Sequence, residues 1–303
     1  MINIRVPATT ANMGPGFDCI GMALEDIYNE LTVEEADRFS IEITSEKSAS
    51  MPTSGDNMIC QAMSMFYSKI DRPMPTLRLR QNDGIPIARG LGSSAACIVA
   101  GLMAANELSG SKLSREELAQ MASAVEGHPD NVAPAILGGL ISGAMDSDEM
   151  KYVKITPSNE LSFAVFIPDF QVLTEKARGV LPPLYSRADA VFNASRASLF
   201  VASMMSGNWD NLRVATQDKI HQPYRSQLIP DMDDIFADSL ELGAKGVFLS
   251  GAGPTLLAIV MKKHEAEFVS EMKKRLGYMK DTWELRAVQA DNNGAQIVRG
   301  ALV

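Results

Sequence analysis

The chain contains little cysteine, little histidine and few aromatic residues. Its 303 residues include three cysteines and three histidines, and aromatic residues make up 6%. An odd number of widely spaced cysteines is not a disulfide framework, and no Cys/His spacing is typical of a zinc site. Cys19, Cys60 and Cys97 each lie among apolar neighbours. We therefore expect buried free thiols and a cytoplasmic protein.

Positive charge and long hydrophobic runs are also scarce. The chain carries 28 Lys and Arg against 37 Asp and Glu, a formal net charge of −9. This balance argues against nucleic acid or an anionic membrane as a partner, because both attract basic proteins. No apolar run approaches the ~18 residues of a membrane span, and Met1–Arg5 does not resemble a signal peptide. An apolar fraction of 46% is ordinary for a globular protein, and a length of 303 residues predicts one or two domains.

A Walker-type phosphate loop, Gly-x-x-x-x-Gly-Lys-Ser/Thr, is absent, but another glycine-rich loop is present. Residues 86–96 read PIARGLGSSAA and run into an alanine-rich segment that should be helical. Glycines let the backbone approach a ligand closely, and the unpaired amides of the helix start attract anions. The hydroxyls of Ser93 and Ser94 can bind phosphate oxygens or Mg²⁺. The loop predicts a site for a nucleoside triphosphate.

Two other interpretations of this loop are weaker. Residues 90–95 fit the dinucleotide pattern Gly-x-Gly-x-x-Ala, which needs a strand before it and an acid at the end of a following strand. Pro86 lies just upstream, and the next acid, Glu107, is in the same helical stretch. A glycine-rich turn capped by serine is the purely structural alternative.

The spacing of apolar residues, together with glycine and capping residues at segment ends, predicts a mixture of strands and helices. The predicted strands cover residues 29–35, 39–44, 76–80, 138–143, 161–167, 246–249, 255–260 and 283–290. The predicted helices cover residues 57–70, 93–108, 114–125, 188–205, 231–242 and 262–276. The irregular alternation favours an α+β fold. The charged stretch Asp146–Glu160 is the best boundary, which predicts domains at 1–155 and 156–303.

Four sequence blocks occur in the order typical of the GHMP kinases. They are Val6–Asp18, the loop at 86–96, Glu126–Ala135 and Leu249–Thr255. The first and third resemble the homoserine kinases more closely than other members. This resemblance covers nearly the whole chain. It implies a two-domain fold, with an N-terminal domain like ribosomal protein S5 domain 2, a ferredoxin-like C-terminal domain, and the nucleotide between them.

The resemblance also implies which residues hold ATP and Mg²⁺. The nucleotide contacts would be Asn57, Pro86, Arg89, Gly90, Leu91, Gly92, Ser93, Ser94 and Ala95. The metal ligands would be Ser94 and Glu126. Asn57 has an alternative role, since an Asn before a helix is a good N-cap. Glu126 lies closer to His128 than the corresponding acid does in other homoserine kinases.

The acceptor implied by the resemblance is L-homoserine, a small zwitterion with a hydroxyl group. Guanidinium groups suit its carboxylate, and carboxylate or amide oxygens suit its ammonium. The substrate contacts would be Asn12, Asp18, His128, Asn131, Thr174, Arg178, Arg225 and Gly251. The catalytic set would be Ser94, Glu126 and Asp18, without a dedicated general base. His221 either orients Arg225 or only packs, and we leave it outside the predicted site.

The expected activity is transfer of the γ-phosphate of ATP to the side-chain hydroxyl of L-homoserine, in threonine biosynthesis. The products would be O-phospho-L-homoserine and ADP. A GHMP kinase for another small alcohol, such as mevalonate or shikimate, is the enzymatic alternative. The second alternative is a nucleotide-binding regulatory or structural member of the family that has lost catalysis. The resemblance further implies a homodimer.

Overall fold

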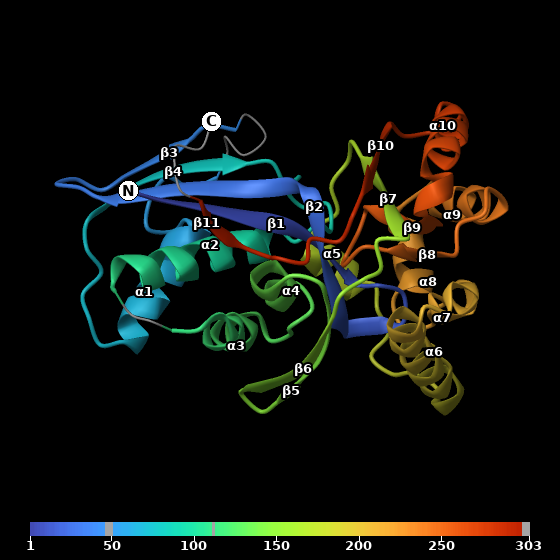
Figure 1. Cartoon of the computed structure of the whole chain (residues 1–303), viewed down its shortest axis with the longest axis horizontal. Helices are drawn as coiled ribbons and strands as arrows, with labels where there is room; N and C mark the ends of the chain where they lie inside the picture. Colours follow the sequence, from blue (N-terminus) through green and yellow to red (C-terminus); the bar gives the residue numbers. More distant parts are fainter. Residues whose placement is uncertain (46–50, 111–112, 299–303) are drawn as a thin grey trace.

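The computed structural model describes residues 1–45, 51–110 and 113–298, and two β-sheets organise them (Figure 1). The first sheet has seven strands, with the central order β11-β1-β2-β4-β3 and with β5 joining β2 to β6. Its strands are β1 (Ile2–Asn12), β2 (Gly16–Glu35), β3 (Ser40–Ile43), β4 (Leu77–Asp83), β5 (Leu140–Asp146), β6 (Glu149–Ile155) and β11 (Gln296–Val298).

Four helices pack on one face of this sheet (Figure 1). They are α1 (Met58–Lys69), α2 (Ser93–Leu108), α3 (Arg115–Glu126) and α4 (Val132–Leu137). Ten of the 16 residues of α2 are buried. Gly101 allows α1 to approach closely, because a Cβ atom there would lie 2.5 Å from the carbonyl oxygen of Ile59. The helix that follows the glycine loop is thus fixed in the core.

The second sheet has four antiparallel strands in the order β10-β7-β9-β8. They are β7 (Leu161–Pro168), β8 (Gly246–Leu249), β9 (Leu256–Met261) and β10 (Trp283–Val288). Numbered along the chain, this order is 4-1-3-2, with helices connecting the first strand to the second and the third to the fourth. That is the ferredoxin-like arrangement. All eight residues of β7 are buried, as expected for a central strand.

The helices of this half surround its sheet. They are α6 (Arg187–Ser206), α7 (Leu212–Ala215), α8 (Gln222–Arg225), α9 (Met232–Glu241) and α10 (Glu265–Leu276). The short α5 (Thr174–Gly179) follows β7. Apolar side chains of α9 and α10 form a core cluster with the sheet. The predicted α+β class is confirmed.

Most predicted helices are confirmed to within a few residues, including the capping box of Ser114 and Glu117 that begins α3. The alternation rule misses β1 and the first part of β2. The residues of β1 from Val6 to Asn12 are all buried, so both faces of the strand meet the core and no polar alternation marks it.

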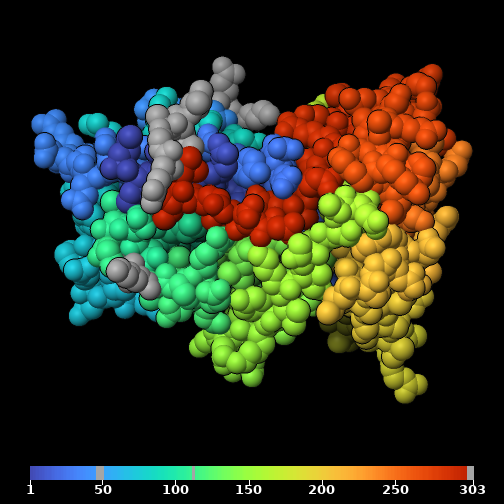
Figure 2. Space-filling view, viewed as in Figure 1, coloured from blue at the N-terminus to red at the C-terminus, as the bar shows by residue number. Residues whose placement is uncertain are grey.

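The chain crosses between the two sheets more than once. The second sheet begins at Leu161, just beyond our boundary at 155. However, β11 returns to pair with β1, although our division assigns it to the second domain. Figure 2 shows this last segment, in red, lying along the first half of the molecule. The division at 155 stays a proposal.

Candidate active site

Three of the four sequence blocks meet where the two sheets adjoin. The backbone N–H of Thr9 donates to Leu91 O at 3.1 Å, and that of Gly251 donates to Ala11 O at 2.9 Å. The hydroxyl of Ser250 lies 2.6 Å from Gly90 O. The glycine loop is therefore held between β1 and the turn that joins β8 to β9.

Gly90 and Gly92 occupy positions that other residues would not fit. Their φ angles are 74° and 71°, in the left-handed region. A Cβ atom on Gly90 would lie 2.3 Å from Ser250 O, and one on Gly92 would lie 2.0 Å from Thr9 Oγ1. The crowding comes from neighbouring blocks, so these glycines serve the close approach of three chain segments as well as the turn.

The backbone amides of residues 90–95 donate no hydrogen bond to any described residue. The first backbone bond of α2 at this end is Ala96 N–H to Gly92 O, at 2.9 Å. Gly92 is the N-cap, and no side chain caps the helix. These amides and the positive end of the helix dipole form a cradle for an anion.

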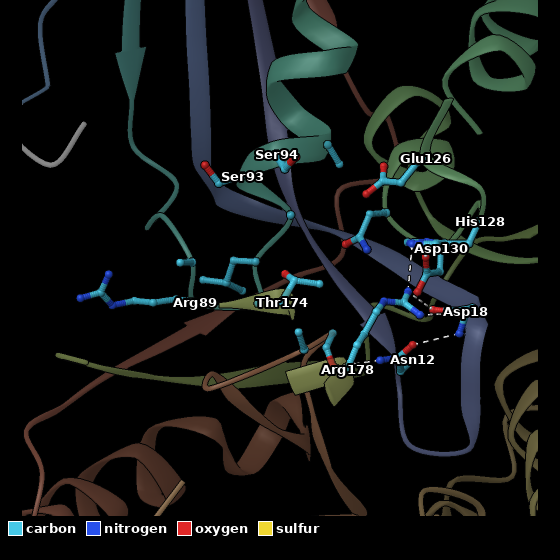
Figure 3. Close-up of a pocket in the computed structure, with 18 of the residues that line it drawn as sticks. Asn12, Asp18, Arg89, Ser93, Ser94, Glu126, His128, Asp130, Thr174 and Arg178 are labelled. Carbon is cyan, nitrogen blue, oxygen red and sulfur yellow. Dashed lines mark hydrogen bonds and ion pairs between the residues drawn. The ribbon is translucent and has the colours of Figure 1, made fainter. Parts of the chain in front are cut away.

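The amide cradle opens into a cavity of about 150 Å³ with a polar lining (Figure 3). The lining residues come from both halves of the chain. They are Asn12, Asp18, Ala88, Arg89, Gly90, Leu91, Gly92, Ser93, Ser94, Ala95, Glu126, His128, Asp130, Asn131, Thr174, Arg178, Arg225, Gly251 and Ala252. The structure thus brings together every residue that we predicted for the substrate and the metal.

Asn12 and Asp18 flank the turn between β1 and β2, and both have left-handed backbone, with φ of 67° and 56°. The Asn12 amide donates to Gly251 O at 2.9 Å and accepts from the Asp18 N–H at 3.0 Å. Asn12 is 3% exposed. Its side chain therefore ties the first block to the last and directs the Asp18 carboxylate into the cavity.

A chain of charged groups crosses the cavity (Figure 3). The Arg178 guanidinium donates to both carboxylate oxygens of Asp18, at 2.9 and 3.2 Å, and lies 3.2 Å from His128 Nε2. His128 Nδ1 in turn contacts the Asp130 carboxylate at 2.5 Å. Burial acts to lower the pKa of His128, but the hydrogen bond and charge of Asp130 outweigh it and raise that pKa. The pair of Asp18 and Arg178 thus places opposite charges in contact within the pocket.

Glu126 ends α3 and points toward the same cavity as Ser94 (Figure 3). Its Oε2 atom is buried without a hydrogen-bond partner among the described residues. Burial raises the pKa of Glu126 to about 7, with the nearby charge of Asp130 adding and that of His128 opposing. A buried carboxylate oxygen without a partner is unfavourable, so it requires a cation or a proton. The Ser94 hydroxyl contacts the thioether of Met58 at 3.0 Å.

Arg225, on α8, is 2% exposed and has no carboxylate in contact among the described residues. It donates to the carbonyl oxygens of Ala177 and Gly251, at 3.1 and 2.9 Å. The ring of Phe17 lies 5.3 Å from its guanidinium and 5.5 Å from that of Arg178. Burial and the charge of Arg178 lower the pKa of Arg225 to about 10. Arg225 is therefore a buried cation beside the Phe17 ring, in a position where it can bind an anion.

Three predicted nucleotide contacts are placed differently from the rest. Asn57 is 1% exposed, does not line the cavity, and caps α1 with its oxygen while its amide nitrogen binds Pro52 O and Gln81. These bonds agree with the N-cap alternative, and the adenine contact of Asn57 stays a prediction. Pro86 is outside the cavity lining. The Arg89 guanidinium points away and binds three backbone carbonyls (Figure 3).

Sequence reasoning missed Asp130, which is 1% exposed and orients His128. The acid two residues after His128 was the available signal. Asp18, His128 and Asp130 also lie close enough together to share a cation, with ligand atoms within 4.8 Å of one another. All three are already engaged in the charge chain described above.

Two family models match this chain. The model of the GHMP kinases N terminal domain matches residues 57–139, and that of the GHMP kinases C terminal domain matches residues 198–277. The chain belongs to the GHMP kinase family, and the predicted two-domain fold is confirmed. No helix within the described residues is both long and apolar enough for a membrane span.

Within that family, curated relatives that match nearly the whole chain at more than 40% identity are homoserine kinases. The homoserine kinase of Caldicellulosiruptor saccharolyticus is 46% identical over 300 residues, which are 98% of this chain and 96% of that protein. A homoserine kinase of Clostridium botulinum is 44% identical over 99% of both chains. The crystal structure of homoserine kinase from Cytophaga hutchinsonii matches with a TM-score of 0.89 and 28% identity, covering 98% of this chain and 97% of that one.

Proposed function

We propose that this protein transfers the γ-phosphate of ATP to the side-chain hydroxyl of L-homoserine, giving O-phospho-L-homoserine and ADP in threonine biosynthesis. The relatives named above share nearly the full length of the chain. The observation that carries the proposal is one cavity in which an amide cradle adjoins a cluster of paired charges. The cradle suits phosphates, and the cluster suits a small zwitterion.

The cradle binds phosphate mainly through backbone groups. Amides of residues 90–95 are available as donors at the start of a buried helix, so they are already oriented before ATP arrives. A preorganised donor set stabilises the developing charge on the transferred phosphoryl group without further reorganisation. The Ser93 and Ser94 hydroxyls add donors at the same place.

The pair of Asp18 and Arg178 matches the charges of the acceptor. In the structure these two side chains neutralise each other. A bound zwitterion would exchange that contact for two others, ammonium to Asp18 and carboxylate to Arg178 and Arg225. Each charge then keeps a partner, so the cost of removing these groups from water stays small. A substrate without an ammonium would leave Asp18 without its new partner, which disfavours mevalonate and shikimate.

Ser94 and Glu126 are the residues that we propose to hold Mg²⁺. The unpartnered Oε2 atom of Glu126 fits that role, because a hard oxygen anion facing the cradle is the kind of ligand that Mg²⁺ takes. The ion, when bound, would neutralise charge on the ATP phosphates. Glu126 would release its proton as the cation binds, since its pKa of about 7 reflects burial without a partner.

The residues of the cavity favour catalysis by positioning. Both carboxylate oxygens of Asp18 face Arg178, and after the exchange they would face the ammonium, which leaves no free general base there. A loose phosphoryl transfer asks little of a base, and orientation with charge stabilisation can suffice. Asp18 therefore contributes by fixing the acceptor, with its hydroxyl aimed at the cradle.

ADP release tests this proposal. Homoserine, threonine, serine, mevalonate and shikimate are each supplied with ATP and Mg²⁺, and we expect homoserine to be phosphorylated far faster than the others. Faster turnover of mevalonate or shikimate would contradict the acceptor assignment, and no turnover of any would favour a non-catalytic member. We also propose a homodimer, which light scattering checks by a mass twice that of the chain.

A further inference from the structure

His221 is completely buried, yet it lies between two segments that line the cavity. Its Nε2 atom contacts the carbonyl oxygen of Gly14 at 2.7 Å, in the turn between Asn12 and Asp18. Its Nδ1 atom contacts Nη1 of Arg225 at 3.2 Å. The imidazole ring therefore joins the turn that carries Asp18 to the helix that carries Arg225.

These two neighbours determine the tautomer of His221. A carbonyl oxygen only accepts, so Nε2 must carry the hydrogen and donate to Gly14. A guanidinium only donates, so Nδ1 must be the unprotonated acceptor for Arg225. A proton on both nitrogens would place a cation against a cation. Burial, with the charge of Arg225 adding, lowers the pKa of His221 to about 4, against the opposing charge of Asp218.

A buried network fixes the backbone of His221. The Asp218 carboxylate accepts from the backbone N–H groups of His221 and Gln222 at 2.8 and 2.7 Å, and from the Asn193 amide at 2.7 Å. Asn193, on α6, also donates to Pro15 O at 3.3 Å. The network thus contacts the turn between β1 and β2 a second time, which leaves the imidazole little freedom.

The orientation of Arg225 depends on few contacts. Its hydrogen bonds among the described residues go to two backbone carbonyls and to His221. Carboxylate recognition by guanidinium is directional, because two parallel N–H groups must meet two oxygens. Losing the imidazole acceptor would release one edge of the guanidinium and separate α8 from the turn of Asp18.

We propose that His221, through its neutral Nε2–H form, is a positioning residue for the acceptor site. It holds Arg225 and the turn from Asn12 to Asp18 in one mutual orientation, so that the carboxylate and ammonium contacts of the substrate are set at a fixed spacing. This proposal rests on the proposed homoserine kinase activity. It assigns His221 no direct contact with substrate or nucleotide.

A double-mutant cycle tests the proposal. We expect His221→Leu to raise KM for homoserine by about 10–100-fold, the range for loss of a hydrogen bond to a charged group, with KM for ATP nearly unchanged. In an Arg225→Ala background, the same His221→Leu change should alter KM for homoserine by less than about threefold, because the guanidinium whose orientation to the turn His221 fixes is then absent. Equal effects in both backgrounds would overturn the proposal.

Two conservative variants separate the two contacts of the ring. The Asn side-chain oxygen can occupy the position of Nδ1, so His221→Asn keeps an acceptor for Arg225. His221→Gln can place its amide nitrogen near Nε2, which keeps the donor to Gly14 but not the acceptor. We expect the KM for homoserine to lie nearer wild type in His221→Asn than in His221→Gln. The reverse order would contradict the role of Arg225, and exposed His264 provides the control, His264→Asn.

A measurement without turnover keeps this inference separate from the proposed function. Long-range ¹H–¹⁵N NMR spectra of the folded protein report which imidazole nitrogen carries the hydrogen. We expect His221 to remain in the Nε2–H form from pH 8 to pH 5. A doubly protonated ring or the Nδ1–H form in that range would overturn the proposal, whatever the enzyme phosphorylates. Failure of homoserine turnover with an Nε2–H ring would instead contradict the proposed function.

Discussion

The glycine loop and the acceptor pocket line the same cavity, but they recognise charge by different means. The loop offers backbone amides from six consecutive residues, 90–95, at the start of a buried helix. The acceptor pocket offers side chains from segments as far apart as Asp18 and Arg225. A backbone site is sensitive to chain geometry, whereas a side-chain site is sensitive to the identity and pairing of its charges.

A further difference lies in how each region balances its charges. The amides of the loop are uncharged donors that remain available within the described part of the chain. The pocket has already paired Asp18 with Arg178 and His128 with Asp130. Loop substitutions should therefore impair ATP selectively, and pocket substitutions should impair homoserine selectively.

The largest effect should follow from distorting the loop. Gly90→Ala would place a Cβ atom 2.3 Å from Ser250 O at a φ of 74°, so the backbone must shift. We expect kcat/KM for ATP to fall by about 100-fold, as for a displacement of about 1 Å at a reacting group. Steady-state kinetics measures this.

A matched control isolates the crowding at Gly90. Gly243 also has a left-handed φ, of 91°, but has nothing within 4 Å of an added Cβ atom. Gly243→Ala should leave kcat and KM for ATP close to their wild-type values. Wild-type ATP kinetics in Gly90→Ala would contradict the importance of loop geometry and remove the contrast between the two regions.

The next effect concerns the arginines of the pocket. Arg225→Ala should raise KM for homoserine by about 10–100-fold, because a charge-assisted hydrogen bond is worth about 1.5–3 kcal/mol. Arg178→Ala should act similarly, and the two effects need not add, because we propose that both arginines bind the carboxylate of homoserine. Calorimetric titration should show an unchanged Kd for ATP in each variant.

Exposed Arg38 supplies the charge-matched control, as Arg38→Ala. Equal loss of ATP and homoserine binding in Arg225→Ala would show that the two regions are one coupled site. Unchanged binding of both ATP and homoserine would mean that Arg178 and Arg225 do not bind the acceptor substrate.

The smallest effect should follow from substituting Glu126, which lines the cavity that the loop and the acceptor pocket share. Glu126→Gln removes the proposed metal ligand, so kcat should fall at least tenfold, about 1.4 kcal/mol of barrier. At high pH, Glu126→Gln should also make the folded protein more stable than wild type. The folded pKa of about 7 lies above the ordinary value of 4.5, so wild-type stability declines as pH rises from 4.5 through 7, and the Gln variant avoids this decline.

Thermal unfolding without added metal checks this sign. We expect Glu126→Gln to exceed wild type by about 2 °C or more at pH 8 and to match it near pH 5. Wild-type turnover by Glu126→Gln would show that its magnesium role is wrong. An equal Tm difference at both pH values would show that the carboxyl group does not titrate in this range.

The same contrast explains how much could be predicted from the sequence. The loop, its helix α2 and the capped helix α3 depend on contiguous residues, so spacing and capping predicted them. Strand β1 was not predicted, because both of its faces are buried and its sequence therefore lacks an alternation of apolar and polar residues. For Asn57 the sequence left two roles open, an N-cap and an adenine contact, and only the hydrogen bonds of the structure show that it caps α1.

By itself, the sequence identified the charged residues and the α+β class, and the resemblance of its four blocks to the GHMP kinases implied the family and the ferredoxin-like half. The tertiary structure alone decided which charges face one another. The bidentate contact of Asp18 with Arg178 spans 160 positions, and the orienting role of Asp130 requires its burial beside His128. The link from His221 to Gly14 spans 207 positions. Such pairings form when the two sheets pack together. The local periodicity of the sequence does not predict contacts between residues so far apart along the chain.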